Sequence, residues 1–528
     1  MAPTRAKARS VATDGAVNRL RFLALTHGRP LWDLAQRVQP VRRRLNASLI
    51  DHAIREMPPR PEPLSTMADY TSWASLTDRT FSGRHLPPVA AREDVRPTPE
   101  RAADLFTRGE TMIPCPRSTV LFAYFAQWFT DGFLRGDVNI PRDPRKNSSN
   151  HHIDLNQLYG LNAAATAALR TFDGGLLKSQ VINGAEFPPH LCENGKIKAE
   201  FAALSVIRFA ELTDAQRDTL FATGSDRGNI HIGFTMLTVL FLREHNRVAR
   251  LLAERHPRWD DERLFQTTRN ILIVLLIKLV VEEYINHITP YHFRFTLDPR
   301  LSAMLGRAPW HRENWASAEF NLVYRWHSLI PSSLSVGGRE LPMAETMVGG
   351  ALIPGPGLGR LFEDASRQRA GRIGLFNTDP ALRAVDVASI AESRALRLAP
   401  YNDYREHCRF PRVRSFDQVS GEPKVSEALR ELYRDVDDLD LYVGLFAEEP
   451  GAPDAMLPPL LTKIIAIDAF SQALTNPLLA SRVFNAATFS PLGMGVITGT
   501  RTLSDVLHRN VPEDPRPRFV SLTRQGEP

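Results

Sequence analysis

Cysteine is scarce in this sequence, and its scarcity limits the kinds of protein that the chain can be. Three cysteines, Cys115, Cys192 and Cys408, are spread over 528 residues. Such spacing argues against a disulfide framework and favours a reducing compartment. The first 20 residues also lack the apolar core of a signal peptide. We therefore expect a cytoplasmic protein.

Apolar runs long enough to cross a bilayer are absent as well. The longest run, Ile271 to Val281, is interrupted by Lys278 and is far shorter than the ~20 residues that a membrane span needs. It is better interpreted as a buried helix at the middle of the fold. Residues 230–255 carry apolar side chains at helical intervals, and strand-like alternation is scarce. The sequence therefore predicts a mainly α-helical protein.

The chain also lacks a Gly/Ser linker, a low-complexity block and an internal repeat that would mark domain boundaries. We expect a tail over residues 1–16, amphipathic helices over 17–54, one large helical domain over 55–515 and a second tail over 516–528. The net charge of +6 is carried largely by arginine, and a general basic balance indicates a solvated surface. No zinc-ligand spacing or basic–aromatic pattern indicates a nucleic-acid partner.

The most informative stretch that is present is Tyr324-Arg325-Trp326-His327. If it is helical, Tyr324 and His327 share one face with their Cβ atoms ~5–6 Å apart. That geometry suits a metal-bound imidazole beside an oxidisable phenol, and a proximal His is a common axial ligand of haem iron. The alternative is a helix with a buried Tyr and a hydrogen-bonded His. These four residues alone do not decide between the two.

The surrounding sequence favours the first interpretation. Residues 319–331 resemble the cyclooxygenase (prostaglandin endoperoxide synthase) branch of the animal haem peroxidase superfamily, whose motif there reads Glu-Phe-Asn-x-x-Tyr-x-Trp-His-x-Leu-x-Pro. Other segments match the family in the same order and at similar spacings. They are Thr26–Arg29, Leu121–Thr130, Ile153–Gly160, Leu242–Val248, Leu264–Arg269, Val281–Tyr284 and Pro290–Phe293. Animal cyclooxygenases carry a signal peptide and a disulfide-rich amino-terminal module. This chain shows neither, so we expect a microbial-type member.

The resemblance implies that haem b is the cofactor, that His327 is the axial ligand of its iron, and that Tyr324 forms the catalytic radical. One departure concerns the distal side, where the family pattern is Ala-Gln-x-Phe-Thr-His. Gln127 matches the Gln of that pattern, but Asp131 stands at the position of the distal His. An Asp with an ordinary pKa of ~3.9 is ionised at neutral pH and is a poor proton donor. We therefore expect slow or altered peroxide reduction. Gln127 and Asp131 are the predicted catalytic residues of the distal side.

The resemblance also implies a substrate channel. Arg55 looks like the arginine that pairs with the fatty-acid carboxylate, with His52 as a rival placement, and Tyr291 matches the tyrosine that assists it. Tyr284 matches the tyrosine that holds the radical tyrosine in place. For the serine that aspirin acetylates in the animal enzymes, Ala469 and Ser471 are both candidates, and the sequence does not choose between them.

The first functional hypothesis is a haem-dependent fatty-acid dioxygenase that acts on a polyunsaturated chain with dioxygen, and that needs peroxide to start. One alternative is a lipid hydroperoxide peroxidase or isomerase that oxygenates nothing. Another is a non-catalytic protein that binds haem and lipid. The basic, apolar segment over residues 17–54 predicts either a weak contact with a membrane surface or a plain solvated face. A homodimer is expected from the resemblance only.

Overall fold

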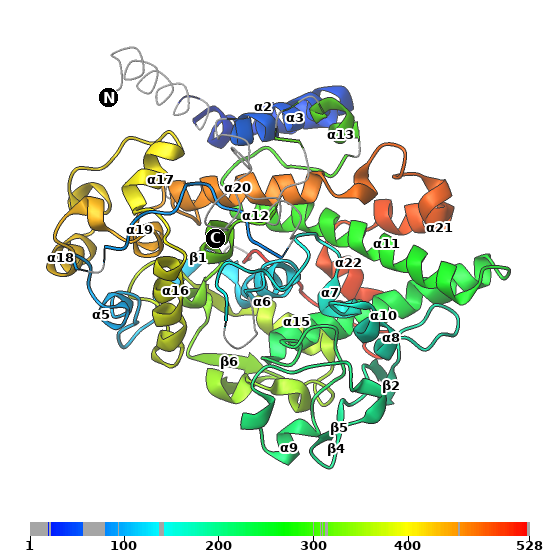
Figure 1. Ribbon diagram of the computed structural model, residues 1–528. Coiled ribbons are helices and arrows are strands. Elements are labelled where there is room, and N and C mark those ends of the chain that lie inside the picture. The colour runs from blue at the N-terminus through cyan, green and yellow to red at the C-terminus, as the bar shows by residue number, and fades with distance from the viewer. Residues whose placement is uncertain are drawn as a thin grey trace.

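The computed structural model describes residues 20, 23–55, 80–92, 94–136, 142–298, 300–306, 308, 310–311, 315–451 and 455–524. Helices dominate this part of the chain, as the sequence predicts (Figure 1). The α-helices are α2 (Arg29–Arg37), α3 (Gln39–Arg55), α5 (Pro99–Ala103), α6 (Val120–Thr130), α7 (Asn156–Tyr159), α8 (Ala163–Leu169), α9 (Asp214–Arg217), α10 (Ile232–Arg255), α11 (Asp261–Leu279), α12 (Ile285–Ile288), α13 (Arg300–Leu305), α14 (Ala318–Val323), α15 (Leu358–Arg367), α16 (Arg383–Ala395), α17 (Tyr401–His407), α18 (Pro423–Leu432), α19 (Leu441–Ala447), α20 (Pro459–Leu474), α21 (Ala486–Gly499) and α22 (Leu503–His508).

The strands are short, and within the described residues they form four two-stranded antiparallel sheets. The pairs are β1 (Pro114–Thr119) with β8 (Arg369–Gly371), β2 (Gln180–Ile182) with β3 (Ala185–Phe187), β4 (Cys192–Glu193) with β5 (Lys196–Ile197), and β6 (Ser333–Val336) with β7 (Arg339–Pro342). Each sheet has only two strands, and the sheets do not join into a larger one. The prediction of a mainly α fold is therefore confirmed.

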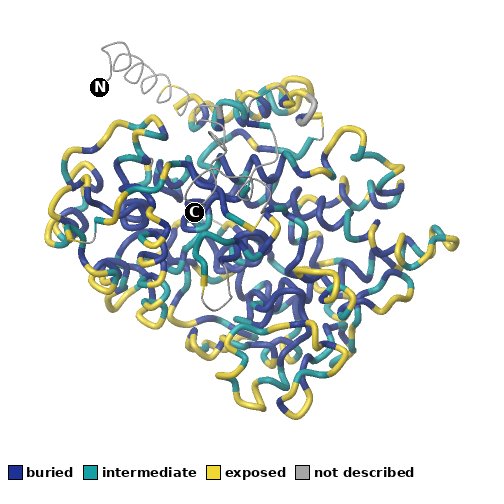
Figure 2. The backbone as a smooth tube through the Cα atoms, viewed as in Figure 1, coloured by how far each residue is buried: buried dark blue, intermediate teal, exposed yellow. Residues whose placement is uncertain are grey.

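The helices α6, α10, α11 and α21 form the centre of the molecule. α10 packs against both α6 and α11, and α11 packs against α21. Figure 2 shows that the residues of this central region are buried and that most exposed residues lie around its edge. α11 contains most of the apolar run that the sequence places in the core, and its residues from Ile271 to Leu279 are all buried.

The ends of α11 explain why the chain becomes helical there. The Asp260 side chain accepts a hydrogen bond from the Arg263 backbone N–H at 2.8 Å, which satisfies one of the free donors at the helix start. Asp261 and Glu262 occupy the first turn and Lys278 the last, so the charges complement the helix dipole. The helix then continues into η3 (Val280–Tyr284), a single π-helical turn.

The charged stretch from Arg243 to Arg247 lies inside α10. Glu244 is fully buried and accepts hydrogen bonds from Arg247, Arg509 and Asn510. Burial alone would raise the pKa of Glu244, but Arg247 and Arg509 outweigh it and hold the pKa below its usual value. Glu244 therefore stays ionised and joins α10 to the segment after α22.

We expect Glu244→Gln to lower the free energy of unfolding by about 3 kcal/mol, because it leaves the partly buried guanidinium groups of Arg247 and Arg509 without their buried carboxylate. Since the pKa is lowered in the folded protein, this stabilisation is complete above the usual value of 4.5 and is lost as the pH falls below it. Thermal unfolding at pH 7 measures the change. Glu254→Gln, at an exposed position of the same helix, is the control, and equal melting temperatures for both variants would contradict the prediction.

α2 and α3 form a separate layer together with α13, on the side of α20 that faces away from the centre (Figure 1). The Trp32 ring lies 6.1 Å from that of Phe293, and the Asn46 amide donates to the Thr296 carbonyl at 2.8 Å. This layer is thus anchored to the segment that follows α12. Residues 1–16 of the expected tail lie outside the described residues, and so do the last four residues of the chain.

Candidate functional site

Tyr324 and His327 lie on a short connection between α14 and β6. α14 begins where the Ser317 hydroxyl accepts a hydrogen bond from the Phe320 N–H, and it ends at Val323. Tyr324 is the first residue after the helix, and His327 opens the 3-10 turn η4 (His327–Leu329). The continuous helix considered for this stretch is therefore wrong. The backbone leaves the helical conformation at Tyr324, so the two side chains are placed by the connection and not by a shared helix face.

The Tyr324 side chain lies among aromatic rings. Its ring centroid is 5.1 Å from that of Phe320 and 4.9 Å from that of Trp326. Burial raises the pKa of Tyr324 above its ordinary range, so the phenol is protonated at every physiological pH. Such surroundings keep water away from the phenolic oxygen.

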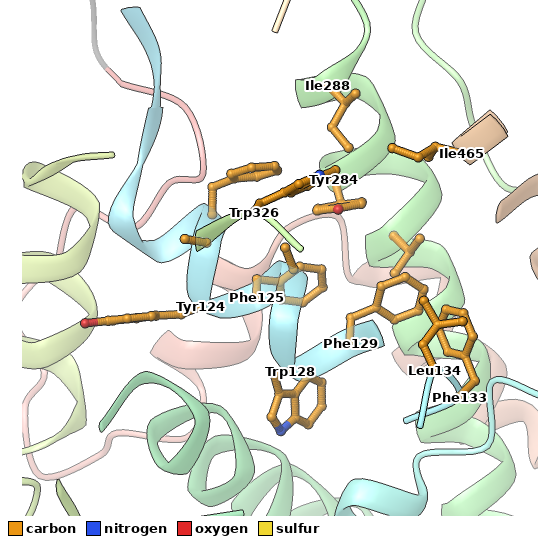
Figure 3. Packing of buried hydrophobic residues seen from close by; sticks show 14 of the residues in the cluster. Tyr124, Phe125, Trp128, Phe129, Phe133, Leu134, Tyr284, Ile288, Trp326 and Ile465 are labelled. Carbon is orange, nitrogen blue, oxygen red and sulfur yellow. The ribbon is translucent and has the colours of Figure 1, made fainter. Parts of the chain in front are cut away.

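Tyr284 is the second tyrosine of the site, and it comes from the π-helical turn η3. Its ring stacks on that of Phe122 at 5.3 Å and lies 5.8 Å from that of Phe125, both on α6. Figure 3 shows Tyr284 close to Phe125 and Trp326. Burial, followed by the influence of Tyr324, raises the pKa of Tyr284 well above its usual value. The structure therefore brings these two predicted residues together.

The contact between the two phenols is imperfect in this structure. The Tyr324 and Tyr284 hydroxyl oxygens are both buried, and neither makes a hydrogen bond of good geometry with any described residue. Each nevertheless affects the pKa of the other. The two hydroxyls are therefore close enough to influence each other's pKa.

His327 has both ring nitrogens available. The side chain is 23% exposed, and in the described part of the chain neither nitrogen is hydrogen-bonded. Nδ1 is buried and lies 3.5 Å from Oδ1 of Asp386 on α16. A half-exposed imidazole with no hydrogen-bond partner fits the predicted role of an axial ligand, because a metal-bound His usually needs one nitrogen for the metal and one for an orienting acceptor.

The predicted distal residues lie at the end of α6. Asp131 follows the last residue of the helix, and its Oδ1 accepts a hydrogen bond from Arg227 at 3.1 Å. The charge of Asp131 is the largest influence on Arg227 and raises its pKa, whereas burial acts to lower it. Asp131 is therefore engaged as the counter-ion of a fixed guanidinium.

Gln127 lies one turn earlier and has a histidine partner. The Gln127 Oε1 is 3.0 Å from Nε2 of His231, the residue that caps the start of α10. Nδ1 of His231 accepts from the Phe234 N–H, so Nε2 carries the proton and donates it to Gln127. Burial lowers the pKa of His231 to about 4, which keeps the ring neutral. This contact leaves the Gln127 amide NH₂ free to face the other way.

Sequence reasoning missed Arg227 and His231. His231 immediately precedes the apolar run of α10, and that position is a helix-start signal which could have drawn attention to it. Arg227 stands in a short loop with no periodic pattern, so no local signal marks it. The arginine becomes informative only once the fold has placed it beside Asp131.

One carboxylate links the two sides of the site. Glu392 on α16 is 3.4 Å from Arg325, two residues before His327, and its charge also raises the pKa of Arg227. The segment that carries His327 and the segment that pairs with Asp131 therefore lie near the same face of α16. The predicted axial and distal residues are brought into one region by this helix.

The predicted carboxylate site is only partly described. Tyr291 is half-buried after α12, and burial raises its pKa. Arg55 is the last residue of α3, but its side chain lies outside the described residues. The pairing of Arg55 and Tyr291 with a substrate stays a prediction.

Ala469 and Ser471 both lie on α20. Ser471 is buried, and its hydroxyl donates to the Ile467 carbonyl one turn earlier at 2.6 Å. Ala469 is half-buried. The structure leaves the choice between them open.

Glu283, the residue before Tyr284, makes this region sensitive to pH. Burial raises its pKa to about 7, and the nearby charge of Asp505 adds to the effect, while the Leu503 N–H that its carboxylate accepts opposes it. In the unfolded chain the pKa returns to the usual 4.5. The folded protein then binds the proton more tightly, so its stability is greatest at low pH and falls as the pH rises through 7.

We expect the free energy of unfolding to fall by about 3 kcal/mol between pH 5 and pH 8 because of Glu283. Glu283→Gln should remove this slope, since the amide does not titrate. Melting temperatures measured across that pH range would show it, with Glu427→Gln, at an exposed position of α18, as the control. A slope that is the same in Glu283→Gln and in the unchanged protein would refute the assignment.

Comparison with protein families gives one match over most of the chain. The model of the family described as animal haem peroxidase matches residues 101–519. Among curated proteins, prostaglandin G/H synthase 2 of Equus caballus is 31% identical over 514 residues, which are 94% of this chain and 81% of that protein. Prostaglandin G/H synthase 1 of Mus musculus is 34% identical over 479 residues, which are 88% of this chain and 76% of that protein.

Solved structures give the same fold at lower sequence identity. The fatty acid alpha-dioxygenase of Oryza sativa superposes with a TM-score of 0.67 at 20% identity, over 82% of this chain and 81% of that chain. Peroxidase A from Dictyostelium discoideum has a TM-score of 0.65 at 20% identity, over 84% of this chain and 96% of that chain. At these identities the likeness establishes the fold alone.

Proposed function

Because the chain belongs to the animal haem peroxidase family, and is therefore a haem-dependent oxidoreductase with haem b as its cofactor, we propose that it is a fatty-acid dioxygenase of the cyclooxygenase type. The observation that carries the proposal is the position of Tyr324, half-buried among aromatic rings with its hydroxyl oxygen buried, close to Tyr284 and three residues from His327. A protein that only bound haem would have no need of this paired arrangement. The names of the similar proteins, which include prostaglandin synthases and a fatty acid dioxygenase, support a lipid substrate.

In this proposal His327, whose side chain is 23% exposed, would hold the haem iron. The bound haem would supply the one-electron oxidant. Tyr324 loses one electron and the phenolic proton, and Tyr284 holds the resulting phenoxyl oxygen in place. The aromatic surroundings of Tyr324 exclude water that would otherwise quench the radical.

The reaction of the lipid begins and ends with the transfer of one hydrogen atom to and from Tyr324. The phenoxyl oxygen takes a hydrogen atom from an allylic carbon, which restores the phenol and leaves a carbon radical. Dioxygen adds to that carbon, and the peroxyl radical takes the hydrogen atom back from Tyr324. One fatty acid and one dioxygen give one hydroperoxide, and the radical is regenerated for the next turnover. Arg55 and Tyr291 orient the chain by its carboxylate.

The residues on the distal side explain why the protein should depend on an added peroxide to start its reaction. Asp131 is committed to Arg227, and the proton transfer that a distal imidazole would perform, typically worth 10²–10⁴-fold, is therefore weak. Gln127, held by His231, can donate hydrogen bonds to a peroxide but cannot accept its proton. The protein should thus start each radical cycle slowly from peroxide.

Oxygen uptake tests the proposal. The haem-reconstituted protein is given linoleate or arachidonate in an oxygen electrode, with and without a trace of added hydroperoxide. We expect rapid uptake with the hydroperoxide and a long lag without it. Absence of uptake from protein that carries its haem would reject dioxygenase activity. Consumption of the hydroperoxide alone would then indicate a lipid hydroperoxide peroxidase or isomerase.

We also propose that the α2 layer rests on a lipid surface. Six of the large apolar side chains that are exposed in the described chain belong to α2, to α3 or to the residues directly before and between them, namely Leu20, Leu23, Leu31, Leu34, Val38 and Val41. Basic residues such as Arg37 and Arg42 lie among them. No helix in the described part of the chain is both long enough and apolar enough to span a bilayer, so the contact would be confined to one leaflet.

We expect Leu31→Ser together with Leu34→Ser to weaken binding to anionic vesicles by about a hundredfold, since two leucines leaving an apolar environment cost about 3 kcal/mol or more. Co-sedimentation with phosphatidylserine-containing vesicles measures the effect. The matched control is Val181→Ser on β2, because Val181 and Leu31 are both 74% exposed. An equal loss in the control, or no loss in the double variant, would argue against the lipid contact.

A further inference from the structure

α16 brings a carboxylate to the side of His327 that faces the protein interior. Oδ1 of Asp386 lies 3.5 Å from Nδ1 of His327, and the Asp386 side chain is only 1% exposed. The distance is slightly too long for a hydrogen bond, but the two atoms are close enough for a small rotation of the imidazole to form one. Asp386 was not among the residues that the sequence marked as functional.

Both members of this pair are incompletely satisfied. Nδ1 of His327 and Oδ2 of Asp386 are buried atoms without a hydrogen-bond partner in the described chain. A buried carboxylate with an unpaired oxygen is costly, and a buried imidazole nitrogen without a partner is costly as well. A hydrogen bond from Nδ1–H of His327 to the nearby Oδ1 of Asp386 would remove the cost of the imidazole nitrogen, and a small turn of the carboxylate that presents Oδ2 instead would remove both costs.

Asp386 is itself held in place from the opposite side. The Tyr442 hydroxyl, on α19, donates to its Oδ1 at 2.9 Å. The Tyr442 ring is fixed by Phe106, stacked at 5.1 Å, and by Phe446, at 5.0 Å. The carboxylate therefore cannot swing away from His327 without breaking a buried hydrogen bond.

We infer that Asp386 is the positioning residue of the axial ligand: it accepts the Nδ1–H of His327, so that Nε2 is directed at the haem iron, and its charge makes the imidazole a stronger electron donor to that iron. The inference rests on the proposed role of His327 as axial ligand. Orienting acceptors of this kind are a general feature of metal-bound histidines, and they raise the basicity of the ligand. Tyr442 moderates the effect, because the proton that it donates to the carboxylate withdraws part of the negative charge.

Two physical consequences follow for the haem-loaded protein. A more basic imidazole binds iron more strongly, which raises the Fe–N(His) stretching frequency of the ferrous form. The added electron density also favours the ferric over the ferrous state, which lowers the reduction potential. Both quantities report on the axial ligand directly, without any turnover.

The test is Asp386→Asn, which keeps the shape of the side chain and removes its charge. Resonance Raman spectra of the ferrous protein should show the Fe–N(His) band at a lower frequency than in the unchanged protein. Spectroelectrochemistry should show a more positive reduction potential. Tyr442→Phe should shift both quantities in the opposite direction, because the carboxylate then keeps its full charge for His327, and this variant carries the test if Asp386→Asn does not fold.

Ser393→Ala is the matched control. Ser393 is buried on α16, two turns after Asp386, and within the described residues its side chain makes no hydrogen bond to His327, Asp386 or Tyr442. Loss of its hydroxyl disturbs the packing of the same helix but removes no charge near His327, so the band and the potential should stay where they are. A general loosening of α16 would move them in this variant too.

The outcomes separate this inference from the proposed function. An Fe–N(His) band that is present in the unchanged protein and unshifted in Asp386→Asn would overturn the role of Asp386 and leave His327 as the ligand. A band that is missing from the unchanged protein, with a spectrum that His327→Ala does not alter, would overturn the ligand assignment and the inference together. Opposite shifts in Asp386→Asn and Tyr442→Phe, with none in Ser393→Ala, would establish it.

Discussion

Tyr324→Phe should abolish fatty-acid-dependent oxygen uptake while the protein still folds and binds haem. Phenylalanine has no O–H bond to lose, so no radical can form at the atom that takes the hydrogen from the lipid. We expect the rate to fall by about 10³-fold or more, which corresponds to a barrier higher by about 4 kcal/mol. The oxygen electrode measures the rate, and haem titration followed in the Soret region shows that the cofactor is retained.

The fold should tolerate this change. Phenylalanine keeps the ring contacts with Phe320 and Trp326, and the lost hydroxyl makes no well-formed hydrogen bond with a described residue. Tyr124→Phe is the matched control, because Tyr124 is a buried tyrosine of α6 whose ring points away from Tyr284 (Figure 3). Uptake that survives in Tyr324→Phe at the rate of the control would reject the radical role of Tyr324.

Asp131→His should raise the rate of peroxide reduction by about 10²–10⁴-fold, the usual contribution of a positioned acid–base group. A neutral imidazole can accept the proton of the peroxide and, once charged, return it to the departing oxygen. The lag before oxygen uptake should shorten in parallel, since initiation and peroxide reduction share this step. Stopped-flow reaction with hydrogen peroxide and a reducing co-substrate measures the rate.

Asp131→His both adds a proton acceptor and removes a negative charge, so its control must separate these two effects. Asp131→Asn removes the partner of Arg227 as Asp131→His does, but it adds no proton acceptor. Arg227 also lies near Asp226 and Glu392, which raise its pKa, so the guanidinium should stay charged and in place in both variants. An equal gain in Asp131→Asn would mean that the carboxylate charge itself slows the reaction, and no gain in a folded, haem-loaded Asp131→His would mean that proton transfer is not limiting.

The helical fold and the centre of the molecule could be predicted from the sequence. The run from Ile271 to Ile277 is apolar on every face, and a helix of that kind is stable only when neighbours surround it, as α10 and α21 surround α11. Tyr324 and His327 were also marked by local sequence, because a motif of four residues combines a phenol and an imidazole. Local residue types are enough for these conclusions, because the conclusions depend only on whether a side chain is apolar and on which groups it can bind.

The tertiary structure decided what those side chains meet. The helix expected through Tyr324 ends at Val323, so the surroundings of His327 depend on a connection whose course no periodic pattern fixes. Arg227 reaches Asp131 across 96 residues of chain, and Asp386 reaches His327 across a gap of 59 positions between elements that share no motif. The sequence by itself determined the chemistry available at the site, whereas the packing of α16 and α6 determined which charges face the axial and distal residues. The physical reason is that electrostatic and hydrogen-bonded contacts act over a few ångströms in space, and sequence separation carries no information about such distances until the core has formed.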